Sequence, residues 1–170
     1  MTAQAVAKEM IRWGNGGSIV MIASMSGSVA NRVSLPLYTH PHSRTPAHCV
    51  LSPTTPRLTL TPPSSIQGLI CPAYNASKAA VIQLARNLAS EWGPHGIRVN
   101  TISPGYIVTA MVENLFKQYP ERRRDWPTQN MLGKLSRPDE YRGAAVFLVS
   151  QASSFMTGAD LKIDGGHSAW

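Results

Sequence analysis

Residues 73–102 read AYNASKAAVIQLARNLASEWGPHGIRVNTI, and this stretch decides the fold. Ala76, Ala80, Leu84 and Leu88 recur at helical spacing, so the pattern predicts a helix over 73–92. Gly93 and Pro94 end that helix, because glycine disfavours a helix and proline removes one of its hydrogen bonds. The apolar run at 97–102 then predicts a buried strand. A helix that leads through a tight turn into a buried strand is typical of α/β proteins.

The segments on either side repeat this alternation. Helical spacing predicts a helix over 2–13, which the glycine-rich residues 14–17 end. The run SIVMIA at 18–23 lacks polar alternation, as does a strand buried on both faces of a parallel sheet. Downstream, the sequence predicts a short helix over 109–119, a loop over 120–137, a helix over 138–150 and a short strand over 161–164. The whole pattern predicts an α/β fold with a parallel sheet.

Residues 33–67 interrupt the pattern. They hold seven of the 13 prolines but no glycine and no acidic residue. This composition is typical of a disordered, proline-rich insertion. A proline-rich docking loop is the alternative. Because Val33-Ser34 and Gln67 permit codons that resemble splice signals, we also hypothesise that the segment translates a retained intron.

Composition argues against several classes of protein. The net charge is +7, but the basic residues are scattered apart from Arg122–Arg124, so we expect no nucleic-acid partner. Cys49 and Cys71 show no metal-ligand spacing with histidines, so we expect no metal and a reducing, cytoplasmic location. The first 13 residues lack the apolar core of a secretory signal, and no apolar run is long enough to span a membrane.

The candidate chemistry centres on Tyr74 and Lys78. Residues four apart on a helix share one face. A lysine cation about 5 Å from a phenol favours the phenolate by roughly 3 kcal/mol at an effective dielectric near 20. Such a pair can exchange protons with a substrate near neutral pH. The alternative is an exposed helix face with an accidental pairing of the two residues.

Two further candidates follow the ends of predicted strands, where parallel sheets bind their ligands. Ser24 comes directly after the strand at 18–23, and Pro104-Gly105 follows the strand at 97–102. Gly105 permits close approach of a ligand. The alternatives are an ordinary polar turn at Ser24 and a plain strand-to-helix turn at Pro104.

Together these motifs resemble the short-chain dehydrogenase/reductase family over residues 1–32 and 68–170. The matching residues are Ser24-x-x-Gly27, Tyr74-x-x-x-Lys78, Pro104-Gly105-x-x-x-Thr109, Thr157-Gly158-Ala159-Asp160 and Asp164-Gly165-Gly166. The ending DGGHSAW is similar to the fungal polyol-dehydrogenase and ketose-reductase branch. The resemblance implies the last three strands of a Rossmann-type, doubly wound parallel sheet with their flanking helices.

The resemblance also implies roles for individual residues. Tyr74 would be the acid/base, Ser24 would stabilise the substrate oxygen, and Lys78 would assist Tyr74 and bind the nicotinamide ribose. The implied nicotinamide contacts are Tyr74, Lys78, Pro104, Gly105, Ile107 and Thr109. The cofactor would be NADP or NAD, with NADP slightly favoured. The implied activity is the interconversion of an alcohol, such as a polyol, and a ketone.

The sequence also lacks a part that the family has. No glycine-rich turn follows a strand, so nothing matches the family's pyrophosphate-binding half. We therefore expect an incomplete domain, with an apolar strand edge exposed at 18–23. The complete family enzyme would be a homo-oligomer that acts on a small molecule. The alternative is an inactive fragment, or an interaction protein that docks on a full-length homologue through its 73–92 helix.

Overall fold

The computed structural model describes residues 2–30 and 72–169. The insertion predicted at 33–67 lies outside these residues. In the described part, helices and strands alternate along the chain, and the strands form one parallel sheet. This arrangement confirms the predicted α/β fold.

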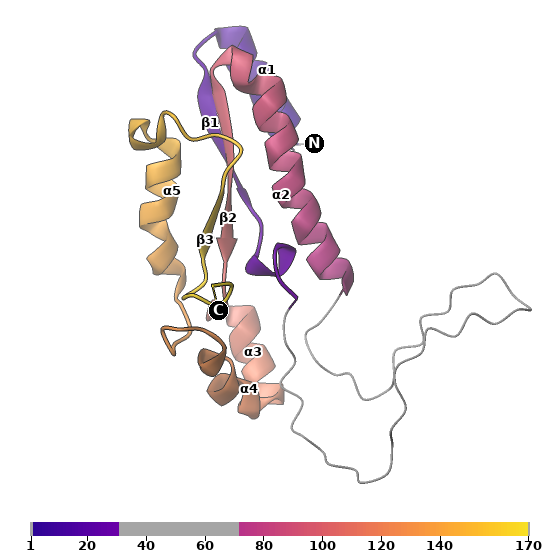
Figure 1. Cartoon of the computed structure of the whole chain (residues 1–170), viewed down its shortest axis with the longest axis vertical. Helices are drawn as coiled ribbons and strands as arrows, with labels where there is room; N and C mark the ends of the chain where they lie inside the picture. The colour runs from indigo at the N-terminus through magenta and orange to yellow at the C-terminus, as the bar shows by residue number, and fades with distance from the viewer. Residues whose placement is uncertain (1, 31–71, 170) are drawn as a thin grey trace, which may run out of the picture.

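The sheet has three strands in the order β1-β2-β3. They are β1 (Gly17–Ile22), β2 (Ile97–Pro104) and β3 (Asp160–Ile163), and both pairings are parallel. The register pairs Gly17 with Ile97 and Thr101 with Asp160. All three carboxyl ends therefore lie at the same end of the sheet, the lower end in Figure 1.

Helices cover both faces of the sheet. Helices α1 (Thr2–Trp13) and α2 (Pro72–Trp92) lie on one side, and α5 (Arg142–Val149) lies on the other (Figure 1). The core on the first side contains small alanines, which allow close helix packing, beside one large aromatic ring. Its buried members are Ala7, Ala85, Ala89, Trp92, Ile97 and Val99.

Polar contacts hold α5 against the sheet. The Ser18 hydroxyl donates to the Leu148 carbonyl oxygen at 2.8 Å. The Arg98 guanidinium donates to the Leu148 and Ser150 carbonyl oxygens at 3.0 and 3.1 Å. A cation at the end of a helix satisfies carbonyls that have no partner within the helix. Side chains of β1 and β2 therefore fix the position of α5.

The loop predicted over 120–137 is wrong in part. Helix α3 (Ala110–Gln118) is followed at once by a second short helix, α4 (Pro120–Asp125). Pro120 suits the first turn of a helix, because its missing N–H would have no helical partner there. Trp126 follows α4, and its ring stacks on Tyr106 with 4.4 Å between centroids.

The helix predicted over 138–150 is also modified. Residues Pro138–Tyr141 form a 3-10 turn, η4, and the α-helix begins only at Arg142. The Arg137 N–H donates to the Glu140 side chain at 2.7 Å, which caps this tighter turn. The capped turn is therefore a 3-10 turn, and the regular α-helix begins only after it.

One edge of β1 faces away from the rest of the sheet. The Gly17 and Ala23 N–H groups donate to the Gly96 and Ile102 carbonyl oxygens, so alternate residues from 17 to 23 face β2. The intervening residues therefore direct their main-chain groups to the opposite edge. Within residues 2–30 and 72–169, no strand pairs with that edge.

Candidate active site

The predicted site residues gather at the carboxyl ends of the strands. Ser24 follows β1, Pro104 ends β2, and Tyr74 and Lys78 lie in the first turns of α2, whose amino end points to the same end of the sheet (Figure 1). A 3-10 turn, η1 (Met25–Gly27), carries the chain from Ser24 and packs against α2. The fold therefore brings the ends of two strands and of one helix to one region.

Ser24 is buried, with 9% of its surface exposed. It caps η1, and its Oγ accepts a hydrogen bond from the Ser26 N–H at 3.2 Å. This bond uses a lone pair of the Oγ atom and not the hydroxyl hydrogen, so the hydrogen can donate to another group. A hydroxyl placed in this way suits a substrate oxygen that gains negative charge.

Tyr74 and Lys78 share one face of α2, as the spacing predicts. The Lys78 Nζ atom lies 5.6 Å from the centroid of the Tyr74 ring, within the range of a cation–π contact. The same Nζ atom donates to the Ile22 carbonyl oxygen at 3.3 Å. This carbonyl belongs to the last residue of β1. The sheet itself therefore holds the lysine beside Tyr74, which is 45% exposed.

The segment from Pro104 to Thr109 is held by its own chain at several points. The Gly105 N–H donates to the Ile163 carbonyl oxygen at 3.0 Å, and Ile107 forms a parallel bridge with Ser136. Thr109 caps α3, where its Oγ1 accepts from the Val112 N–H at 3.3 Å. Like Ser24, it keeps a hydroxyl hydrogen that can donate outward.

Gly105 lies close to the residue that follows β3. A Cβ atom at position 105 would lie 2.7 Å from the Asp164 Cα and 3.1 Å from the Asp164 carbonyl oxygen. Backbone atoms cannot rotate away as a side chain can. Gly105 is therefore required for the close packing of the end of β2 against the residue after β3.

Asp164 organises the turn that follows β3. Its carboxylate accepts from the Gly166 N–H at 2.9 Å, the Ser168 N–H at 3.0 Å and the Ser168 hydroxyl at 2.6 Å. Burial raises the pKa of Asp164, but these donors and the nearby His167 outweigh burial, so the pKa lies below its ordinary value. The carboxylate form therefore stabilises this turn.

Sequence reasoning missed Tyr106, which joins the Pro104–Thr109 segment to the helices beyond it. Its hydroxyl donates to Gln129 Oε1 at 3.0 Å, and its ring stacks on Trp126. Burial raises the pKa of Tyr106, so it stays protonated as a donor. A large aromatic residue directly after Pro-Gly is the sequence signal that could have identified it.

The described residues fit one end of a nicotinamide cofactor better than the other. The Lys78 ammonium and the Thr109 hydroxyl can donate to a ribose and an amide. For the pyrophosphate, the described part of the chain offers no glycine-rich turn between a strand and a helix, since Gly14–Gly17 comes after α1 and leads into β1. No three His, Cys, Asp or Glu side chains gather for a metal within these residues.

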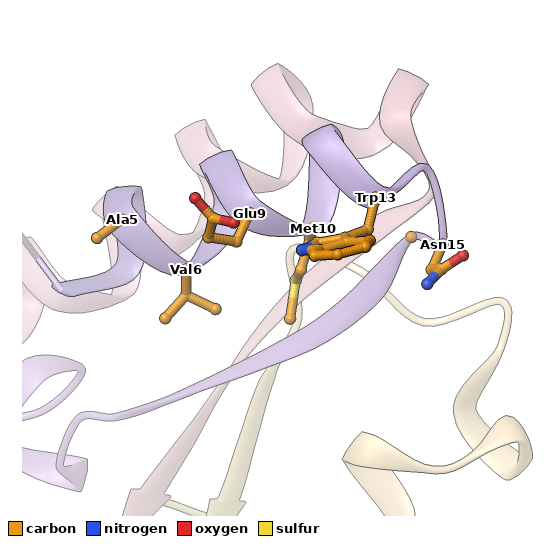
Figure 2. Close-up of a pocket in the computed structure, with 7 residues that line it drawn as sticks. Ala5, Val6, Glu9, Met10, Trp13 and Asn15 are labelled. Atoms are coloured by element: carbon orange, nitrogen blue, oxygen red, sulfur yellow. The ribbon is translucent and has the colours of Figure 1, made fainter.

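A groove lies away from this site, beside α1 (Figure 2). Its lining residues are Ala5, Val6, Glu9, Met10, Trp13, Asn15 and Gly16. Asn15 and Gly16 precede β1, so the groove extends to the amino end of the sheet, opposite to the candidate site. None of the predicted site residues lines it. Among the described helices, none combines the length and the apolar character needed to cross a membrane.

Comparison with known proteins supports the fold and the family resemblance. A family model described as enoyl-(acyl carrier protein) reductase matches residues 64–168. A short-chain dehydrogenase/reductase of Aspergillus versicolor, notP′, is 40% identical over 100% of this chain and 47% of its own length. A D-arabinitol 2-dehydrogenase (ribulose-forming) of Candida albicans is 34% identical over 99% of this chain and 48% of its own.

Solved structures agree with these relatives. A short-chain type dehydrogenase/reductase from Mycobacterium marinum is 34% identical, with a TM-score of 0.70 over 99% of this chain and 51% of that one. A gluconate 5-dehydrogenase from Burkholderia cenocepacia, in complex with NADP and tartrate, is 28% identical with the same TM-score. The chain spans about half the length of the curated relatives it matches. The family match over more than half of the chain and the shared fold show that the chain belongs to the short-chain dehydrogenase/reductase family.

Proposed function

We propose that this chain provides the proton-transfer part of an NAD(P)-dependent oxidoreductase that interconverts a polyol and a ketose. The observation that carries the proposal is the Lys78 ammonium, which lies 5.6 Å from the Tyr74 ring centroid and bonds the Ile22 carbonyl oxygen, two residues before the buried Ser24. A proton donor, a cation and a hydrogen-bond donor are the groups that carbonyl reduction requires from a protein.

In the direction of reduction, the Tyr74 hydroxyl donates its proton to the substrate carbonyl oxygen as that oxygen becomes negative. The Ser24 hydroxyl donates a hydrogen bond to the same oxygen. The Lys78 cation stabilises the phenolate that remains on Tyr74. A nicotinamide cofactor, when bound, would supply the hydride. In the direction of oxidation, each proton moves in reverse.

The names of the relatives support the substrate class. They include D-arabinitol 2-dehydrogenase, NADH-dependent L-xylulose reductase and NADP-dependent mannitol dehydrogenase. Each of these names specifies an acyclic polyol or a ketose as the substrate. Both cofactors occur among them, so we propose NADP or NAD, and we propose Pro104, Gly105, Ile107 and Thr109 as contacts of the nicotinamide.

The test measures the reduction of D-ribulose and L-xylulose through the decrease in absorbance of NADH or NADPH. Tyr74→Phe should lower turnover by about 10²–10⁴-fold, because it removes the proton donor and keeps the ring. Tyr119→Phe is the matched control, since Tyr119 lies after α3, outside the proposed site. Equal activity of Tyr74→Phe and the unaltered chain would refute the proposed role.

A second candidate function is a non-catalytic chain that associates with a longer homologue. It is favoured by one observation, the lack of a phosphate-binding turn in the sequence. The chain would then bind a family member through α2 and show no turnover with either nucleotide. Turnover that disappears in Tyr74→Phe would exclude this alternative.

A further inference from the structure

The turn after Ser24 approaches α2 unusually closely at Gly27. A Cβ atom at position 27 would lie 2.7 Å from the Lys78 carbonyl carbon, 2.8 Å from the Ala79 nitrogen and 2.9 Å from the Lys78 oxygen. All three are backbone atoms of a helix, so no side-chain rotation could relieve the overlap. Only glycine allows η1 to lie at this depth against the helix.

The same short segment also holds the far end of the Lys78 side chain. The Ile22 carbonyl oxygen accepts from Lys78 Nζ at 3.3 Å. Ile22 and Gly27 lie on either side of Ser24 in the chain. Residues 22–27 therefore contact Lys78 twice, at its backbone and at its ammonium group, and carry the proposed substrate-binding hydroxyl between the two contacts.

We propose that Gly27 is a positioning residue that sets the distance between the Ser24 turn and Lys78. This inference rests on the proposed function only for its effect on turnover. A methyl group at position 27 forces η1 and α2 apart. Such a shift lengthens the Lys78–Ile22 contact and separates Ser24 from the pair on α2. Misplacement of reacting groups by about 1 Å can cost about 10²-fold in rate.

The first experiment measures the acylation rate of each lysine by mass spectrometry in the unaltered chain and in Gly27→Ala. Lys78 should react about three- to tenfold faster in Gly27→Ala, the factor expected for the loss of one hydrogen bond. The exposed Lys8 and Lys162 should keep their rates. Gly143→Ala is the matched control, because a Cβ atom at Gly143 meets nothing within 4 Å.

Two results would overturn the proposal: an unchanged rate at Lys78, or an equal increase at every lysine, which would indicate general destabilisation. If Gly27→Ala does not fold, the unaltered chain still tests the Lys78–Ile22 contact on which the proposal rests. Lys78 must then react more slowly than Lys8 and Lys162, and equal rates would refute its anchoring.

The second experiment measures ketose reduction. Gly27→Ala should lower kcat by about tenfold or more and leave KM for the ketose nearly unchanged, because geometry rather than binding is altered. A rise in KM at constant kcat would contradict a positioning role. If the unaltered chain shows no turnover, the proposed function fails, while the acylation rates still test the placement of Lys78.

Discussion

Asn100 offers a sharp test of how the sheet is held together. Its side chain lies in β2 and is 0% exposed. Its Nδ2 donates to the Met156 carbonyl oxygen at 2.8 Å, and its Oδ1 accepts from the Ala159 N–H at 3.0 Å. Asn100→Leu keeps a branched side chain but removes both bonds. Because each buried group left unpaired costs about 1–3 kcal/mol, the free energy of unfolding should fall by about 2–6 kcal/mol.

Urea unfolding followed by circular dichroism measures this change, with an unaltered slope confirming two-state behaviour. The matched control is Asn87→Leu, because Asn87 bonds Gln83 on the exposed surface of α2. That control should change stability by less than about 0.5 kcal/mol. If Asn100→Leu also loses less than about 0.5 kcal/mol, the two bonds do not hold the segment before β3 against β2.

Four other outcomes are expected. Ser24→Ala should lose most ketose reduction and Ser26→Ala little; the reverse in steady-state assays would assign the oxygen-binding role to Ser26. The chain should bind NADPH and NADH with dissociation constants of about 1 mM or weaker, because none of the described turns from a strand to a helix is glycine-rich; micromolar binding by fluorescence titration would contradict this. The stabilisation from Asp164, whose pKa is lowered, is present above its ordinary pKa and lost as pH falls through the folded value. Asp164→Asn should therefore lower the Tm at neutral pH and flatten its decline below about pH 4; an unchanged Tm profile would refute the role of the carboxylate. The chain should self-associate through the edge of β1 that no described strand pairs with and through the groove beside α1. Trp13→Glu, at a residue 68% exposed, should weaken this association, and a monodisperse monomer of the unaltered chain in light scattering would contradict the prediction.

The long elements could be predicted because each has a strong periodic pattern. Helix α2 and strand β2 lie within one residue or two of the predicted ranges, since apolar spacing and Gly93-Pro94 mark their limits. Helix α4 was missed because PERRRD has no apolar periodicity. The signal was present in another form, with Pro120 and Glu121 at its start and arginines in its last turn.

In the candidate site too, local geometry could be predicted from the sequence, whereas contacts between distant residues could not. Side-chain spacing places Tyr74 and Lys78 on one helix face, because that geometry is local. The close packing of Gly105 against Asp164 could not be predicted, because Asp164 lies far along the sequence. The Ile22 carbonyl could not be predicted as a partner of Lys78, since every residue has a carbonyl and only tertiary structure selects one.

The anchoring of Lys78 on a peptide carbonyl has an evolutionary consequence. A main-chain acceptor persists whichever side chain occupies the position, provided that the strand still forms. The Ile22 side chain is 59% exposed, so many residues can replace it at little cost. Genetic drift at position 22 therefore leaves the lysine contact intact, which gives the contact mutational robustness. A survey that ranks positions by their variability would pass over residue 22, although its peptide group fixes the lysine beside Tyr74.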